Sequence, residues 1–324
     1  MASSSENKNL YYRYEIMKNV WTGYLRRRCH FAAVNKATSY FDTFIMQHRT
    51  FQHSIMKIFD GTRHIMVDKE QYDTIRRELE AKTSATFPDI NPYDGNDSRN
   101  VIERQRHFTT QKQFNSQLEE LESENSKIFQ RAREDAAEHK RKLCQVLTEK
   151  KDTKFLCLDL EVHDQDRKTI LEIGYLKFTL KEGENPEYFH AVVNEELHNR
   201  EGFDNKEKFK FGTTVRMPLE EAAEELKKAV AGSDALLTHS GYNDKQYLTD
   251  NGIDIEEKPM FDTQKLALNI LQGRIRCWGL KRMMDEMRIS YDESILHNAG
   301  NDAHYTMMAF KALVKRAMPG LASK

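Results

Sequence analysis

The stretch Phe155-Leu-Cys-Leu-Asp-Leu-Glu161 decides how the fold of this chain is interpreted. A continuous apolar run of this length is typical of a β-strand buried on both faces. Because alternate side chains of a strand share a face, Asp159 and Glu161 are expected to point the same way. Two such carboxylates repel each other and lose hydration, so they cost stability unless something neutralises them. Carboxylate oxygens are ligands that Mg²⁺ and Mn²⁺ prefer, so a metal site is one interpretation of the two acids. The alternative is an ordinary strand that ends in solvated acids.

Strand and helix patterns alternate on the C-terminal side of this stretch. Further strands are expected at residues 169–178, 187–194, 235–238 and 260–261. Helices are expected at residues 219–231, 263–271, 279–288 and 302–316. Three strands in succession, followed by alternating helices and strands, are typical of an α/β sheet with helices on both sides. The sequence therefore predicts an α/β domain over residues 152–320.

Two further motifs place acidic residues at the ends of predicted elements. His239-Ser-Gly-Tyr-Asn-Asp244 follows the strand at 235–238 and leads into a helix. His297-Asn-Ala-Gly-Asn-Asp302 precedes the last helix, so Asp302 falls in its first turn and His297 in the loop before it. One short motif of this kind is a weak signal, whereas three in a fixed order are specific.

These motifs resemble those of the DEDDh branch of the ribonuclease H-like 3′→5′ exonucleases. Asp-Leu-Glu at 159–161 matches the D-x-E of that family, and His297 with Asp302 matches its H-x4-D. Ile-Leu-Glu-Ile-Gly in the second strand resembles the E-I-G strand of the family, and the motif at 239–244 fits H-N-A-x-F-D loosely. The last motif also resembles a fungal subgroup, the C-terminal domain of the "good for full DEAD-box protein activity" family linked to messenger-RNA export. The resemblance covers roughly residues 152–318.

The resemblance implies a ribonuclease H-like mixed sheet flanked by helices. It also implies a 3′→5′ exonuclease that hydrolyses the phosphodiester bonds of RNA or single-stranded DNA with two Mg²⁺ or Mn²⁺ ions. By the same resemblance, Asp159, Glu161, Asp244 and Asp302 hold the ions. His297 takes the proton from the attacking water, a role that suits a group titrating near neutral pH.

Residues beside the motifs have less direct interpretations. Val162 and His163 follow the first motif, where many relatives carry Thr or small residues whose backbone meets the terminal nucleotide. Both are therefore candidate substrate-binding residues, and an exposed loop is the alternative for His163. His239 occupies a position that is structural in the family. Asp262 is expected to cap the following helix, and Thr263 is the alternative cap.

Composition limits the cellular setting. The net charge of −1 neither requires nor excludes nucleic acid as a partner. The four cysteines are scattered without a C-x-x-C pair, which argues against a zinc ribbon or a disulfide framework and indicates a reducing compartment. No stretch has the apolar length of a membrane span, and the N-terminus lacks a signal-peptide core. We therefore expect a cytoplasmic or nuclear protein without membrane contact.

The N-terminal half carries no comparable motif. Residues 11–59 predict two or three helices, residues 62–68 a strand and residues 69–81 another helix. A loop is expected at 87–98. From about 100 to 150 the chain is highly charged without Pro or Gly, which predicts one long helix that lies on a domain or binds a protein partner. The expected division is a mainly helical region of unknown role at 1–99, the long helix at 100–151 and the α/β domain at 152–320.

One basic cluster stands out near the N-terminus. Residues 1–49 contain eight Lys and Arg residues against three acids, and Arg26-Arg27-Arg28 lies close to Trp21, Tyr24 and Phe31. Arginines of this kind track phosphates while aromatic rings stack on bases. The alternative is a solvated basic helix face whose aromatic residues belong to the core.

A second hypothesis comes from a different functional class. The chain would be a nucleic-acid-binding or adaptor protein of messenger ribonucleoprotein, with the α/β domain as a scaffold and the N-terminal half holding partners. All five residues of the candidate site are present, and a scaffold has no need for four clustered carboxylates. The exonuclease hypothesis is therefore favoured.

Overall fold

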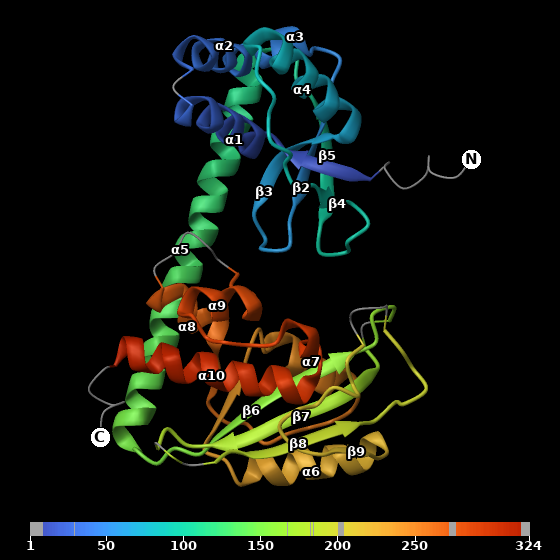
Figure 1. Cartoon of the computed structure of the whole chain (residues 1–324), viewed down its shortest axis with the longest axis vertical. Helices are drawn as coiled ribbons and strands as arrows, with labels where there is room; N and C mark the ends of the chain where they lie inside the picture. The colour runs from blue at the N-terminus through green and yellow to red at the C-terminus, as the bar shows by residue number, and fades with distance from the viewer. Residues whose placement is uncertain are drawn as a thin grey trace. The chain divides into compact units, whose positions relative to one another are not determined.

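The computed structural model describes residues 9–28, 30–166, 168–181, 183, 185–199, 204–271 and 277–318. The chain divides into two compact units, Met1–Arg131 and Ala132–Lys324 (Figure 1). The long helix α5 (Gln111–Glu149) contributes side chains to the core of each unit. None of the helices in the described ranges combines the length and the apolar character needed to cross a membrane.

The N-terminal unit is built on a five-stranded antiparallel sheet in the order β4-β1-β3-β2-β5. The strands are β1 (Leu10–Arg13), β2 (Gln52–Lys57), β3 (Arg63–Asp68), β4 (Tyr93–Asp94) and β5 (Val101–His107). The helices are α1 (Tyr14–Arg27), α2 (Phe31–Asp42), α3 (Phe44–Gln47) and α4 (Lys69–Thr83). Tyr12, Ile55 and Ile65 of the sheet share one buried core with these helices and with Phe114 and Leu121 of α5.

The helices expected in this unit are present, and the strand and helix predicted at 62–81 are confirmed as β3 and α4. Several expectations need correction. β1 lies at the start of the stretch predicted to be helical, and β4 lies in the predicted loop at 87–98. Gln52–Lys57 forms β2 instead of a helix, and the long helix begins at Gln111 instead of near Asn100 because Val101–His107 forms β5. β5 is an edge strand whose side chains are nearly all exposed, so it lacks the apolar alternation that identifies a strand in a sequence.

A buried histidine in β2 makes this unit sensitive to acid. His53 is fully buried, and the ring centroids of Phe44, Phe108 and Phe114 lie within 5.9 Å of its own. Among the described residues, neither ring nitrogen has a hydrogen-bond partner. Burial lowers the pKa of His53 to about 4. The unfolded chain binds this proton near pH 6.5, so stability that is present above pH 6.5 is lost as the pH falls toward 4.

We expect His53→Leu to remove much of this acid sensitivity. Between pH 7 and pH 4.5 the free energy of unfolding of the wild type should fall by roughly 2–3 kcal/mol more than that of the variant. Urea unfolding followed by the fluorescence of the buried Trp21 in the same unit measures this difference. His30→Leu, at an exposed histidine, is the control and should keep the wild-type dependence on pH. Identical pH profiles for His53→Leu and the wild type would contradict the expectation.

The C-terminal unit contains a six-stranded mixed sheet in the order β11-β10-β6-β7-β8-β9. Its strands are β6 (Phe155–Val162), β7 (Ile170–Phe178), β8 (Glu187–Val192), β9 (Thr214–Arg216), β10 (Ala235–Thr238) and β11 (Met260–Asp262). Its helices after α5 are α6 (Leu219–Ala231), α7 (Tyr242–Asp250), α8 (Thr263–Ile270), α9 (Leu280–Met287) and α10 (Ala299–Ala317), with a 3-10 turn at Glu293–Ile295. The predicted α/β fold, a mixed sheet flanked by helices, is confirmed. The three-residue strand β9 was not expected.

The alternation of β6 decides which side chains face which helices. Leu156, Leu158 and Leu160 pack with α6 on one face, whereas Phe155 and Cys157 pack with α10 on the other. Because Asp159 and Glu161 continue the second series, they belong to the face that α10 covers. The sheet therefore brings the first acidic motif to the helix that carries the last one.

A glycine in β7 allows this close approach. Gly174 pairs with Asp159 across the β6–β7 ladder. A Cβ atom at Gly174 would lie 2.1 Å from the carbonyl carbon of Ala299 and 2.3 Å from the amide nitrogen of Gly300. The first turn of α10 therefore rests directly on the backbone of β7.

Candidate active site

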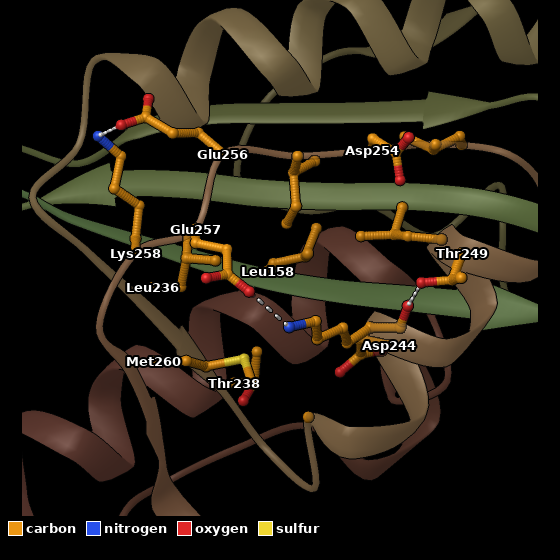
Figure 2. Close-up of a pocket in the computed structure, with 15 residues that line it drawn as sticks. Leu158, Leu236, Thr238, Asp244, Thr249, Asp254, Glu256, Glu257, Lys258 and Met260 are labelled. Atoms are coloured by element: carbon orange, nitrogen blue, oxygen red, sulfur yellow. Dashed lines mark hydrogen bonds and ion pairs between the residues drawn. The ribbon is translucent and has the colours of Figure 1, made fainter.

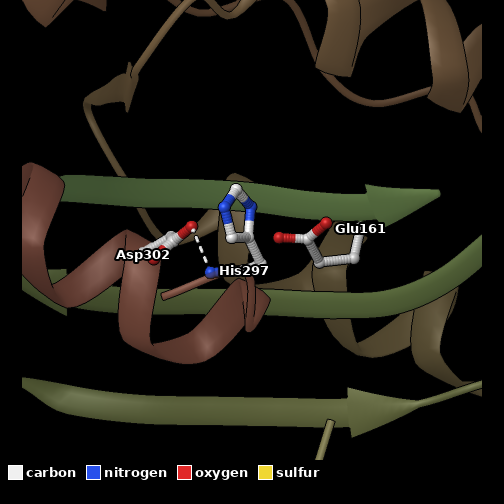
Figure 3. Close-up of side chains that lie close together, drawn as sticks. All are labelled: Glu161, His297 and Asp302. Carbon is white, nitrogen blue, oxygen red and sulfur yellow. Dashed lines mark hydrogen bonds between the residues drawn. The ribbon is translucent and has the colours of Figure 1, made fainter. Parts of the chain in front are cut away.

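The structure brings the first and last motifs together. Oxygen and nitrogen atoms of Glu161, His297 and Asp302 lie within 4.8 Å of one another. Figure 3 shows the imidazole ring of His297 between the two carboxylates. The backbone N–H of His297 donates to Oδ2 of Asp302 at 3.1 Å. His297 has a φ of 60°, a left-handed conformation that turns its N–H back toward the helix that follows.

Among the described residues, Asp159 and Asp244 are not part of the group within 4.8 Å, but the charges of Asp302, Glu161 and Asp244 all act on Asp159. Burial, and then the charges of Asp302, Asp244 and Glu161, raise the pKa of Asp159 well above its usual value. Burial and Asp302 do the same for the pKa of Glu161. Burial raises the pKa of Asp244 to about 8 and that of Asp302 to about 7. Four carboxylates in this state cannot all ionise near neutral pH unless cations balance their charge.

The side-chain atoms at this site are suitable ligands for divalent metal ions. Oδ1 of Asp302 is buried and has no hydrogen-bond donor among the described residues. Such an oxygen needs a proton or a cation as its partner. The ligands available are carboxylate oxygens and one imidazole, without sulfur, which is the set that Mg²⁺ and Mn²⁺ accept.

A buried hydrogen-bond network fixes the first turn of α10, and the sequence analysis missed it. Oε2 of Glu172 accepts hydrogen bonds from the Ala299 N–H at 3.1 Å and the Asn298 side chain at 3.1 Å, and it lies 2.8 Å from Nε2 of His190. Oδ1 of Asn298 in turn caps the helix by accepting from the Asn301 N–H at 3.0 Å. Glu172, His190 and Asn298 are all buried. This network holds the helix turn that carries Asp302.

Two members of the network had a signal in the sequence. A glutamate between Leu171 and Ile173 in an apolar strand is an unpaired buried charge unless a partner exists. Asn298 stands four residues before Asp302, where a helix N-cap is expected. His190 belongs to no motif, so only the strand pairing of β7 with β8, which sets it opposite Gly174, reveals it.

The middle motif is held by the helix that follows β11. Nδ1 of His239 lies 2.8 Å from the Thr263 hydroxyl, in keeping with a structural role. The Ser240 N–H donates to Oδ1 of Asp262 at 3.1 Å, and the same oxygen accepts from the Gln264 N–H at 2.8 Å. The predicted cap at Asp262 is therefore confirmed. It also orients the turn that precedes Asp244.

Helix α5 supports the same region from its C-terminal half. The backbone N–H of Asp262 donates to Nε2 of His139 at 2.7 Å. The His139 ring packs against Phe261, and Lys265 pairs with Asp135 at 2.8 Å. Residues of α5 thus cover the edge strand β11 and belong to the structure around the site.

The candidate substrate-binding residues lie at the end of β6. Val162 is the last residue of the strand, and its carbonyl oxygen accepts from the Asn199 side chain at 3.0 Å. The His163 N–H donates to the Thr169 carbonyl at 2.9 Å, and its Nδ1 lies 4.0 Å from Oδ2 of Asp166. Both residues therefore follow Glu161 at the same end of the sheet, and their contact with substrate stays a prediction.

A cavity of about 550 Å³ opens on the other face of the sheet (Figure 2). Leu158, Leu236, Leu248 and Met260 contribute to its apolar walls. Asp244 lines the cavity too, as the one motif acid that does so. Asp159 and Glu161 face away from Leu158 and do not line this cavity, so Asp244 is the residue that the cavity and the acid motifs share.

The residues that match a known family lie in the C-terminal unit. Residues 154–313 match the family model described as "DNA polymerase III subunit epsilon-like, C-terminal domain" of the DEDDh type. The "uncharacterized nucleolar protein C2C4.08" of Schizosaccharomyces pombe is 27% identical over 176 residues, which are 50% of this chain and 69% of that protein. The zinc-bound complex of E. coli ExoI with single-stranded DNA aligns with a TM-score of 0.35 and 13% identity. The alignment covers 52% of this chain and 42% of the ExoI chain.

Proposed function

We propose that this chain, whose residues 154–313 belong to the DEDDh exonuclease family, removes nucleotides from the 3′ end of RNA or single-stranded DNA. The observation that carries the proposal is the meeting of Glu161, His297 and Asp302 within 4.8 Å. The charges of Asp302, Glu161 and Asp244 on the buried Asp159 support it. Family membership supports a nuclease, and the 3′→5′ direction and the substrate are our proposal.

Each residue of the cluster has a proposed role. Asp159, Glu161, Asp244 and Asp302 would hold two divalent ions, Mg²⁺ or Mn²⁺. When bound, such a pair supplies an activated water and offsets the charge that develops on the phosphate and the leaving oxygen. His297 accepts the proton of the attacking water. Its partial burial lowers the pKa, so the ring is neutral and able to accept a proton at pH 7.

Substrate contacts are proposed for the end of β6. The backbone of Val162 and the side chain of His163 would meet the terminal nucleotide, since they are the two residues after Glu161, a proposed metal ligand. For the location in the cell we propose the nucleus, because the Schizosaccharomyces pombe relative is described as nucleolar.

One observation favours the adaptor hypothesis. The N-terminal unit lies outside the matched residues 154–313 and has a fold and a core of its own. A protein partner on α5 stays a prediction of that hypothesis. Phe114 and Leu121 already pack in the N-terminal unit and Leu143 and Leu147 in the C-terminal unit, so such a partner would use the remaining face of the helix.

The test uses the full chain with 5′-labelled single-stranded RNA and DNA. With Mn²⁺ or Mg²⁺ we expect a ladder of products shortened from the 3′ end, no products in EDTA, and none with Asp159→Ala. A substrate with a blocked 3′ end should resist cleavage and so establish the direction. If neither substrate is cut with either metal but both are bound, the adaptor hypothesis replaces this proposal.

A further inference from the structure

The hairpin of α1 and α2 is positively charged between its outer ends, which carry the acids Glu15 and Asp42. Residues 16–41 contain five Lys and Arg residues and no Asp or Glu. Lys18 is paired outside this range, with its Nζ 3.3 Å from Oδ1 of Asp42. Arg26, Arg27 and Arg28 are exposed, and none of them has an ion-pair partner among the described residues. A polyanion is the complementary partner for such a surface.

The aromatic residues of the hairpin divide into core and surface. Trp21 is fully buried against Tyr72 and Phe87, so an interpretation in which it stacks on bases is wrong. The guanidinium of Arg28 lies 4.5 Å above the half-buried Tyr24 ring. Phe31 is 73% exposed and is the first residue of α2, three residues after Arg28. A phenylalanine ring as exposed as that of Phe31 contributes little to the core, so its position has another explanation.

The simpler explanation of the arginines accounts for part of the pattern. Arg26 and Arg27 lie in the last turn of α1, where cations balance the helix dipole. Arg28 lies beyond that turn, and the helix dipole gives no reason for an exposed phenylalanine. Cations next to an exposed ring are the combination that binds single strands, because phosphates need charge and unpaired bases need a flat apolar surface.

We propose that Arg26, Arg27, Arg28 and Phe31 form a docking surface for single-stranded nucleic acid, which we call the α1–α2 patch. The arginines contact phosphates and Phe31 stacks on a base. The proposal goes beyond cleavage at the acid cluster, since it concerns binding by the N-terminal unit. It stands or falls by affinity and does not depend on whether strands are cut.

The experiment measures binding of the full chain to a labelled single-stranded oligonucleotide in EDTA, across a series of salt concentrations. The triple variant Arg26→Gln/Arg27→Gln/Arg28→Gln should bind about 10- to 100-fold more weakly at moderate salt. The slope of log affinity against log salt should become shallower by about 2, because three phosphate contacts are lost at about 0.7 each. RNA and DNA oligonucleotides are compared to show which sugar is preferred.

Phe31→Ala separates stacking from charge. It should weaken binding by about 5-fold or more and leave the salt slope unchanged. Because Phe31 is exposed, the variant should fold as the wild type does, which circular dichroism checks. Duplex DNA, whose bases are already stacked, should bind more weakly than the single strand and respond little to Phe31→Ala.

The matched control removes three charges elsewhere. Lys140→Gln/Arg141→Gln/Lys142→Gln alters another run of three basic residues, in which Arg141 and Lys142 are already paired with Glu138. This control should retain most of the affinity. An equal loss in both triple variants, or an unchanged affinity in the Arg26–Arg28 variant, would overturn the α1–α2 patch. If the wild type cleaves strands but the Arg26–Arg28 variant binds with normal affinity, the nuclease proposal stands and the α1–α2 patch is wrong.

Discussion

Replacing Asp302 with asparagine is expected to reduce cleavage by at least about 10³-fold and at the same time to raise the stability of the metal-free protein. The loss of activity follows from removing one metal ligand from a cluster in which all four acids contribute. The gain in stability follows from burial, which raises the pKa of Asp302 to about 7. A neutral amide avoids the cost of ionising this group.

The sign of this effect depends on pH. The unfolded Asp302 loses its proton near pH 3.8, whereas the folded one keeps it to about pH 7. Stability is therefore lost as the pH rises from 4 to 7, and the benefit of Asp302→Asn is largest above pH 7. We expect its melting temperature at pH 8 in EDTA to exceed that of the wild type by on the order of 2–8 °C. Adding Mn²⁺ should stabilise the wild type more than the variant.

Asp234→Asn is the matched control for this experiment. Hydrogen bonds from Lys150 and the Lys154 N–H lower the pKa of Asp234, so its charge is favourable in the folded state. This variant should be slightly less stable than the wild type and fully active. A melting temperature of Asp302→Asn below that of the wild type, or substantial remaining cleavage, would contradict the account of the acid cluster.

The second large effect is expected from a single added methyl group. Gly174→Ala places a Cβ atom 2.1 Å from the backbone of Ala299, so β7 and α10 must separate. Flexible side chains relieve such a clash at little cost, but here the atoms met belong to a helix backbone held by Glu172 and Asn298. We expect a loss of several kcal/mol in stability and cleavage below about 1% of the wild type.

Gly232→Ala tests whether the glycine position matters. A Cβ atom at Gly232 makes only ordinary contacts, at 3.6 Å and 3.7 Å. This variant should melt within a few degrees of the wild type and stay active. Cleavage assays and thermal unfolding of the two variants give the comparison. If Gly174→Ala were as stable and active as Gly232→Ala, the direct packing of α10 on β7 would be wrong.

The parts of the fold that the sequence predicts are those with a local cause. β6 was predicted because apolar side chains fill both of its faces, and the acids of β6 and α10 were found because each stands at an element end. β5 was missed because an edge strand with polar side chains has no local signature. The contact of His190 with Glu172 depends on the β7–β8 pairing, and no short-range pattern encodes such a pairing. For the same reason the sequence left the role of Trp21 open until its packing was known.

The contacts of α5 redefine the smallest fragment that would fold by itself. A fragment cut at residue 152, where the family resemblance begins, would lack Leu143 and Leu147, two members of the buried core that also contains Phe155 and Phe310. It would also lose His139, whose Nε2 accepts a hydrogen bond from the backbone N–H of Asp262 in the edge strand β11. We therefore expect a fragment that folds by itself to begin near Ala132, where the C-terminal compact unit begins, and to include the C-terminal part of the helix.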